Sequence, residues 1–212
     1  MEKGSTTEAS LGVLISGRGS NLQSLIDAQS AGELPARIAV VISNKPNAQG
    51  LDRARAAGIE ALTISHRDFQ DRDAFDHELA KALKDRGVTL VCLAGFMRLI
   101  GRPLLEAFPD AILNIHPSLL PSFPGVDAQA QALAHGVKVS GATVHLVNGD
   151  LDAGPIIAQA TVPVKDDDTA ESLSRRILVE EHRLYPLAIR IVLAGGWKTD
   201  GRRFMRAPDV SV

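Results

Sequence analysis

The stretch Leu11-Gly12-Val13-Leu14-Ile15-Ser16-Gly17-Arg18-Gly19-Ser20-Asn21-Leu22 decides the fold class. Residues 11–16 are almost entirely apolar, which is typical of a strand buried on both faces of a sheet. Two glycines then allow a sharp turn and a close approach of the backbone to a ligand. Ser20 and Asn21 are residue types that suit the start of a helix. The stretch therefore predicts a strand, a short loop and a helix, which together begin a βαβ unit.

The same alternation continues through the first half of the chain. Further apolar runs predict strands at 38–43, 60–64, 89–94 and 111–115. Helical spacing of apolar residues lies at 21–31, 48–57, 72–86 and 103–108. Strands without polar alternation indicate a sheet that is covered on both faces. We therefore expect an α/β fold, doubly wound around a mostly parallel sheet and Rossmann-like.

The second half has a different pattern. Residues 139–147 and 156–164 read as two strands around a turn-rich segment, which predicts an antiparallel or mixed C-terminal edge. A final helix is expected over 169–194, starting near Thr169 and broken or kinked at Pro186. The domain organisation is expected to be a disordered extension at 1–10, one domain at 11–195 and a polar tail at 196–212.

Composition excludes several classes of protein. The 212 residues carry 23 basic and 25 acidic side chains, a formal charge of -2, without the basic stripe of a nucleic-acid-binding surface. Cys92 is the single cysteine, so an intrachain disulfide is impossible and a reducing compartment is favoured. No apolar segment is long enough for a signal peptide or a membrane span. We expect a cytoplasmic protein that binds neither nucleic acid nor membrane.

The loop after the first strand has the residues of an anion site. Gly19, Ser20 and Asn21 stand where the N–H groups and the dipole of a helix start would meet an anion. A dinucleotide site is disfavoured because Leu22 replaces the third glycine and no acid follows the strand at 38–43. A P-loop is excluded because no Lys-Ser/Thr pair follows. We interpret the loop as a cradle for one phosphate; the alternative is a tight turn with a cap.

The strongest chemistry follows the fifth predicted strand. Alternation along an extended chain places Asn114 and His116 on the same side of the strand, at the edge where ligands of such sheets bind. A carboxamide can stabilise an oxyanion and an imidazole can relay a proton, which are the needs of acyl transfer. Asp152, in the acidic turn 148–154, is the candidate partner that orients the imidazole, and His145 is expected to face the same cleft. Ordinary turn and capping roles are the alternatives.

Other catalytic sites find no support in the sequence. The histidines and the single cysteine lack zinc-type spacing, so no metal is expected. The segment Asp166-Asp167-Asp168 is interpreted as a solvated turn or a helix lead-in. Without a Gly-x-Ser-x-Gly elbow or a Cys–His pair, direct attack on a carbonyl is simpler than covalent catalysis.

These motifs resemble the phosphoribosylglycinamide formyltransferase family of purine synthesis. The resemblance runs from about Leu11 to Ala194 and rests on the strings 15–22, 93–98, 113–121, 143–145 and 150–154. The string Asn-x-His-Pro-Ser-Leu-Leu-Pro, from Asn114 to Pro121, is specific to the wider folate formyltransferase group. The glycine-Ser-Asn loop narrows the choice to the glycinamide enzymes. The resemblance implies a glycinamide ribonucleotide substrate and a 10-formyltetrahydrofolate co-substrate, without a metal.

The resemblance also implies roles for individual residues. Catalysis would belong to Asn114, His116 and Asp152, with Asp152 favouring the charged imidazole. The phosphate and ribonucleotide would be bound by Gly19, Ser20, Asn21 and Glu181. The folate would be bound by Arg72, Met97, Arg98, Leu99, Ile100, Asn114, Asn148, Gly149, Asp150, Leu151 and Asp152. The chain departs from many relatives at Asp127, where they carry a histidine, and this puts a loop contact or the loop's pH behaviour in doubt.

Three alternative functions are kept open. A 10-formyltetrahydrofolate hydrolase would use water in place of the amine, and its members usually carry an extra N-terminal domain. A methionyl-tRNA formyltransferase would be expected to have a C-terminal domain and a basic surface. A folate- or nucleotide-binding module would bind without turnover. The partners are otherwise expected to be small molecules, with the chain a monomer or a homodimer.

Overall fold

A single nine-stranded sheet runs through the computed structural model, which describes residues 9–207. Its order is β3-β2-β1-β4-β5-β6-β7-β9-β8. The strands β1 to β5 are parallel, whereas β6 is antiparallel to both β5 and β7. The mostly parallel sheet with antiparallel C-terminal strands is confirmed. The strands are β1 (Ala9–Ile15), β2 (Ala36–Ser43), β3 (Glu60–Thr63), β4 (Leu90–Leu93), β5 (Ile112–His116), β6 (Val139–Leu146), β7 (Ile156–Pro163), β8 (Trp197–Asp200) and β9 (Arg203–Arg206).

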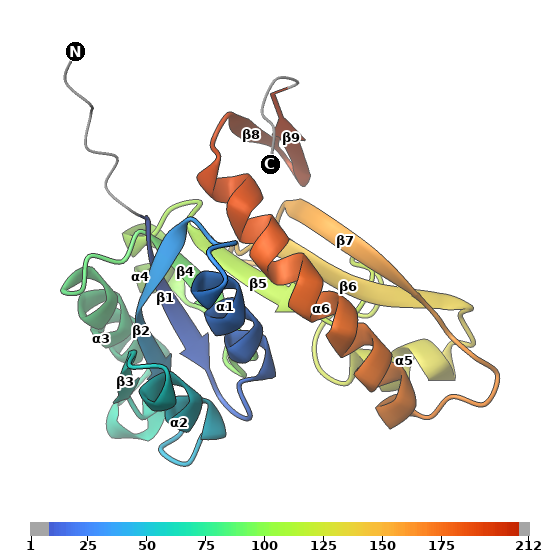
Figure 1. Ribbon diagram of the computed structural model, residues 1–212, viewed down its shortest axis with the longest axis horizontal. Helices are drawn as coiled ribbons and strands as arrows, with labels where there is room; N and C mark the ends of the chain where they lie inside the picture. The colour runs from blue at the N-terminus through green and yellow to red at the C-terminus, as the bar shows by residue number, and fades with distance from the viewer. Residues whose placement is uncertain (1–8, 208–212) are drawn as a thin grey trace.

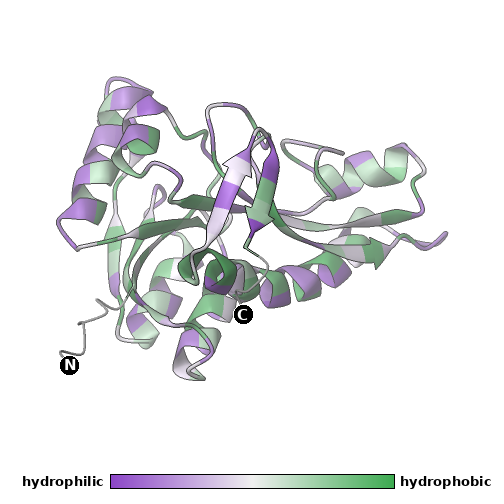
Figure 2. Ribbon diagram, turned by 90° about the horizontal axis from the view of Figure 1, so that it is seen from above, coloured by the Kyte–Doolittle hydropathy of each residue, from purple (hydrophilic) through white to green (hydrophobic). Residues whose placement is uncertain are grey.

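Helices cover both faces of the sheet. They are α1 (Ser20–Ser30), α2 (Gln49–Ala56), α3 (Arg72–Lys84), α4 (Arg102–Ala107), α5 (Ala128–Ala134) and α6 (Ala170–Leu193), with a 3₁₀ turn at His66–Asp68. Figure 1 shows α1 and α6 on the near face, with α6 running diagonally across the C-terminal strands. Seen from above, the most hydrophobic residues concentrate on the strands and on the inner sides of the helices (Figure 2).

Alternation along the parallel strands feeds two separate cores. Leu11, Val13 and Ile15 of β1 pack in the core beneath α1 and α6, whereas Leu14 packs in the core beneath α3 and α4. All four side chains are fully buried, which explains why β1 lacks polar alternation.

The same alternation decides which way the polar residues of β5 point. Leu113 and Ile115 enter the core beneath α6, and Ile112 enters the opposite core. Asn114 and His116 therefore point to the face of the sheet opposite α1 and α6.

The segment expected to be a polar tail is part of the sheet. The strands β8 and β9 form an antiparallel hairpin, and Arg203 of β9 pairs with Ile156 of β7. Trp197 and Phe204 stack with ring centroids 5.0 Å apart and pack against the core beneath α6. The prediction was wrong because these two aromatics lie outside any long apolar run and gave no periodic signal. Residues 208–212 lie outside the described part of the chain.

Two other expectations concern chain termini and helix ends. Ala9 and Ser10 belong to β1, so the expected disordered extension at 1–10 is wrong for these two; residues 1–8 lie outside the described part of the chain.

Helix α6 begins after Thr169 with a capping box to Ser172, as predicted. Pro186 does not break the helix, because its lost hydrogen bond is offset by a buried apolar face on both sides of it.

None of the helices within residues 9–207 combines the length and the apolar character needed to cross a membrane.

Candidate active site

The loop between β1 and α1 has the geometry of an anion cradle. Gly19 adopts the left-handed conformation with φ of 70°, and a Cβ there would lie 2.6 Å from Cα of Gly50. Glycine is therefore required by both backbone conformation and space. Gly19, not Ser20 or Asn21, precedes the first turn of α1, and no side chain caps it. The predicted cap is wrong, and the first N–H groups of α1 are left for a ligand.

Glu181 joins this cradle from the far end of the sequence. The Asn21 side-chain amide donates to Oε2 of Glu181 over 3.0 Å, and Glu181 is only 6% exposed. Burial raises the pKa of the Glu181 carboxyl to about 7, and the hydrogen bond from Asn21 opposes this only in part. The structure thus brings together Asn21 and Glu181, as the resemblance implied.

A pH-dependent stability follows from Glu181. Its raised pKa means that the unfolded chain ionises first as pH rises from 4.5 to about 7, so this group lowers the free energy of unfolding across that window, by up to about 3 kcal/mol. We expect Glu181→Gln to abolish this decrease. Urea unfolding at pH 5 and pH 8 measures it: the variant should gain stability relative to the wild type at the higher pH. An equal difference at both pH values would contradict the raised pKa.

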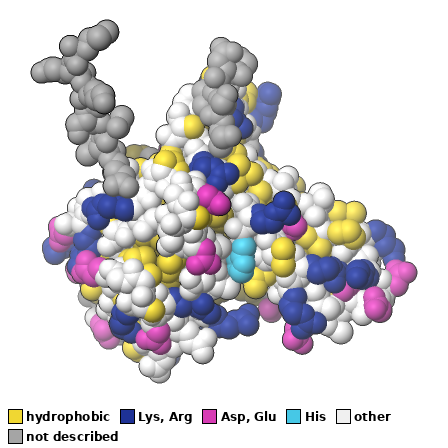
Figure 3. All heavy atoms as spheres, in the orientation of Figure 1, with side chains coloured by type: hydrophobic (Ala, Val, Ile, Leu, Met, Phe, Trp, Pro, Cys, Tyr) yellow, Lys and Arg dark blue, Asp and Glu magenta, His cyan; other side chains and the backbone are white. Residues whose placement is uncertain are grey.

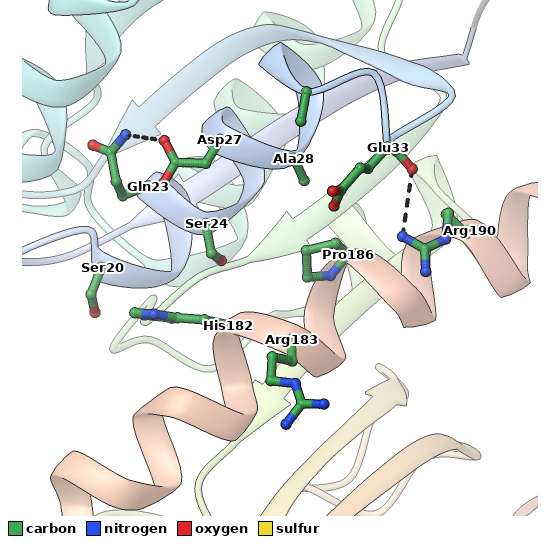
Figure 4. A pocket seen from close by; sticks show the side chains of 11 residues that line it. Ser20, Gln23, Ser24, Asp27, Ala28, Glu33, His182, Arg183, Pro186 and Arg190 are labelled. Carbon is green, nitrogen blue, oxygen red and sulfur yellow. Dashed lines mark hydrogen bonds between the residues drawn. The ribbon is translucent and has the colours of Figure 1, made fainter.

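A hollow of about 580 Å³ lies beside the cradle, between α1 and α6. Histidine, acidic and basic side chains meet near the middle of this face (Figure 3). His182 extends toward Ser20, and Arg183, Pro186 and Arg190 follow it along α6 (Figure 4). Burial lowers the pKa of the His182 imidazole. The hollow shares Ser20 with the cradle but lies on the α1 and α6 face, away from the side chains of Asn114 and His116.

Asn114, His116 and Asp152 converge at the carboxyl end of β5. Nδ2 of Asn114 lies 3.4 Å from Oδ1 of Asp152, and Nδ1 of His116 lies 3.4 Å from Oδ2 of the same carboxylate. His145, opposite Asn114 on β6, accepts a hydrogen bond from Nδ2 of Asn114 at 3.2 Å. Nδ1 of His145 donates to the carbonyl of Leu146, which leaves Nε2 as the acceptor. The structure thus places the three expected residues and His145 in one cluster.

The surroundings of His116 fix its tautomer. Nε2 lies 2.8 Å from the carbonyl oxygen of Phe123, which can only accept, so Nε2 carries a hydrogen. The unprotonated Nδ1 then faces Asp152. Burial lowers the pKa of His116, and this exceeds the opposing effects of the Phe123 carbonyl and of Asp152. Asp152 acts in the expected direction, but desolvation of the ring is larger.

Asp152 is held in an unusual backbone conformation. Its φ is 49°, in the left-handed region that non-glycine residues seldom adopt. Its Oδ2 accepts a hydrogen bond from the N–H of Gly125 at 2.8 Å. Burial would raise the pKa of the Asp152 carboxyl, but the nearby His145 side chain, the hydrogen bond from the N–H of Gly125 and the nearby His116 lower it overall. A charged carboxylate is thus present beside Nδ1 of His116 at neutral pH.

Exposed apolar side chains lie in the loops that follow β4 and β6. Met97 and Leu99 in the loop after β4 are 67% and 55% exposed, and Leu151 beside Asp152 is 54% exposed. The hydroxyl of Ser16 accepts a hydrogen bond from the N–H of Met97 at 2.8 Å, which ties this loop to β1. Exposed apolar side chains combined with a polar cluster suit the binding of a flat heterocycle whose edges form hydrogen bonds.

Of the two expected arginines, Arg98 lies in the same loop between Met97 and Leu99, and Arg72 lies at the start of α3. The Arg98 guanidinium lies 5.7 Å from the ring centroid of Phe75, and Ile100 packs against the core beneath α3 and α4. Arg72, at the start of α3, borders Gly101, whose N–H donates to the buried Asp76. Asn148 and Asp150 form a turn in the loop after β6, where the Asp150 N–H donates to Asn148 Oδ1. Arg98 thus belongs to the loop that carries Met97 and Leu99, and Arg72 borders the end of that loop at Gly101.

Residues 10–189 match the family model described as "Formyl transferase". This match covers most of the chain. The chain belongs to the formyl transferase family. Curated relatives of this formyl transferase include the phosphoribosylglycinamide formyltransferase of Escherichia coli (strain K12), 43% identical over 190 residues, which are 90% of this chain and 87% of the relative. The trifunctional purine biosynthetic protein adenosine-3 of Drosophila melanogaster is 50% identical over 185 residues.

The matched residues make up 86% of this chain but only 14% of the length of that trifunctional relative. Among solved structures, glycinamide ribonucleotide transformylase 1 from Symbiobacterium toebii is similar, with a TM-score of 0.91, 57% identity and 92% of each chain covered. Family membership implies a folate-type co-substrate. Within residues 9–207, no group of three or more His, Cys, Asp and Glu side chains is placed to hold a metal ion.

Two contacts of this formyl transferase could not be predicted from its sequence. The carbonyl of Phe123 and the N–H of Gly125 fix His116 and Asp152 through backbone atoms, which no residue type reveals. Asp127, the departure from the family pattern, is exposed with φ of 56° and precedes α5 without capping it by its side chain. Nothing in the structure explains the aspartate at this position.

Proposed function

We propose that this formyl transferase moves the formyl group of 10-formyltetrahydrofolate to the amine of phosphoribosylglycinamide. The observation that carries the proposal is the cluster of Asn114, His116 and Asp152 near a separate anion cradle. The two sites follow β5 and β1, with β4 between them, which is a separation of about 10 Å at ordinary strand spacing. A small substrate with a phosphate at one end and an amine at the other spans that distance.

The proposed chemistry is a direct transfer. The substrate amine attacks the formyl carbon, and Nδ1 of His116 accepts the amine proton because it is the unprotonated ring nitrogen. The carboxylate of Asp152 stabilises the imidazolium that forms. The proton then moves to the folate nitrogen as its bond to the formyl carbon breaks.

The oxyanion is assigned to Asn114. One N–H of its carboxamide is engaged by His145 at 3.2 Å, and the other makes a long contact of 3.4 Å to Asp152. The long contact is the weaker one, so this N–H can turn to the formyl oxygen as negative charge develops there. His145 then holds the carboxamide in place through the other hydrogen.

Binding of both substrates is assigned to the residues that border the two sites. The substrate phosphate and ribose are assigned to Gly19, Ser20, Asn21 and Glu181. The folate is assigned to Arg72, Met97, Arg98, Leu99, Ile100, Asn114 and the loop of Asn148, Gly149, Asp150, Leu151 and Asp152. The exposed apolar side chains support a heterocycle at this place, and the two arginines support an anionic end of the folate.

An absorbance assay of 10-formyltetrahydrofolate consumption tests the proposal. We expect consumption only when the glycinamide ribonucleotide is present, with one formyl group recovered on the amine for each folate consumed. Consumption at the same rate without the amine would replace the proposal with hydrolysis. Binding of the folate without consumption under either condition would instead indicate a binding module. The names of the matched relatives favour transfer over hydrolysis.

We place this reaction in the cytoplasm with small molecules as partners. Cys92 is buried and free, which fits a reducing compartment. A monomer or a homodimer fits this function equally, and neither nucleic acid nor membrane takes part in it.

A further inference from the structure

The hairpin of β8 and β9 reaches the loop that carries Asp152. We propose that this hairpin is part of the active site and that Arg202, in its turn, is a positioning residue that holds Asp152 against His116. The inference rests on the proposed function of Asp152. It concerns a segment beyond the residues 10–189 that the family model matches.

The hairpin is anchored firmly enough to act as a support. Nε1 of Trp197 donates to the carbonyl of Val192 at 3.0 Å, and its ring stacks on Phe204. The N–H of Ala207 donates to Gly196 at 2.8 Å and closes the base of the hairpin. Pairing with β7 aligns the hairpin with the end of the loop 147–155. The turn between β8 and β9 therefore has a fixed place relative to that loop.

Arg202 makes the contact between the hairpin and the loop. Its Nη2 donates to the backbone carbonyl of Asp152 over 3.4 Å. At its other end, the Asp152 side chain accepts from the N–H of Gly125 at 2.8 Å. Asp152 is thus held on its backbone by one segment and on its carboxylate by another. Two such contacts fix the direction of the carboxylate, which one contact alone leaves free to rotate.

The loop needs this support because of its own conformation. Its base is fixed, since the N–H of Leu146 donates to Pro155 at 2.9 Å and a Cβ at Gly154 would lie 1.8 Å from the oxygen of Leu146. Its tip is exposed from Gly149 to Leu151. Asp152 lies between tip and base with positive φ, a conformation that persists only where neighbouring groups stabilise it. Arg202 supplies one of those groups.

Kinetics of three variants test the role of Arg202. We expect Arg202→Ala to lower kcat by about three- to tenfold, the effect of one exposed hydrogen bond from a charged donor, with little change in KM for either substrate. Arg203→Ala removes the same charge from the next position and should leave kcat unchanged. Arg202→Lys, which retains a donor, should recover part of the loss.

The pH profile separates positioning from a general loss of structure. Asp152 raises the pKa of His116, so a displaced Asp152 should shift the acidic limb of the kcat profile to lower pH in Arg202→Ala. Arg203→Ala should retain the wild-type limb. An unshifted limb in Arg202→Ala would overturn the inference.

Amide hydrogen exchange gives a test that does not depend on turnover. Exchange of the segment 147–155 should be faster in Arg202→Ala than in the wild type and unchanged in Arg203→Ala. Equal exchange in the two variants would overturn the contact itself. Faster exchange in Arg202→Ala in a protein that transfers no formyl group would leave the contact in place and refute the proposed function instead.

Discussion

Replacing His116 with alanine is expected to lower kcat by about 10³-fold, within the range found for general acid–base residues. Both substrates should still bind, because the cradle and the apolar side chains around the centre are untouched. The loss has a defined origin. Nδ1 of His116 is the unprotonated ring nitrogen beside Asp152, and the Phe123 carbonyl holds the ring in that orientation.

His116→Gln is the matched control for this prediction. Glutamine can donate to the Phe123 carbonyl as the imidazole does, but it does not accept a proton near neutral pH. We therefore expect a loss similar to that of the alanine variant, measured as kcat at saturating substrates. Near-normal turnover in both variants would exclude His116 as the proton carrier.

The wild-type pH profile provides a further expectation. Burial lowers the pKa of His116 below its ordinary value of 6.5, so the uncharged base is present at pH 7. Activity should fall only as pH drops through the lowered pKa, with an acidic limb below pH 6.5. A limb above that value, found in kcat measured from pH 5 to pH 9, would contradict the lowered pKa.

Local sequence patterns predicted the parallel part of the sheet well, because an uninterrupted apolar run is explained by burial on both faces. The fully apolar runs require cover on both faces, and β1, β2, β4 and β5 form parallel strands near the expected places. The hairpin of β8 and β9 could not be predicted. Its stability comes from one aromatic stack and from pairing with β7, which are tertiary contacts without a local pattern. The break expected at Pro186 is absent for a related reason, because packing along α6 outweighs the local preference of proline against helix.

The candidate site, like the fold, could be predicted from the sequence only in part. Alternation along β5 was enough to place Asn114 and His116 on one face. The distance of Asp152 from both could not be derived, because it depends on a left-handed backbone conformation and on an N–H of Gly125. The net charge of His116 was also beyond sequence reasoning. It is a balance between desolvation and a nearby carboxylate, and only the burial of the ring decides the sign.

Asp152→Asn is expected to lower kcat by about 10²- to 10³-fold while both substrates still bind. The asparagine side chain has the same size and can still accept from the Gly125 N–H. Its amide nitrogen would then take the place of Oδ1, which lies 3.4 Å from Nδ2 of Asn114, so two N–H donors would face each other. The variant also loses the negative charge that stabilises the imidazolium. Both effects act on the transfer step, so kcat and kcat/KM should fall together.

Asp110→Asn is the matched control, since it removes the same charge from an exposed residue that also has a positive φ but lies outside the proposed site. It should retain wild-type kcat. Loss of the Asp152 charge should also shift the acidic limb of any residual activity to lower pH, because Asp152 raises the pKa of His116. If Asp152→Asn and Asp110→Asn have equal kcat, the carboxylate beside His116 has no part in the transfer.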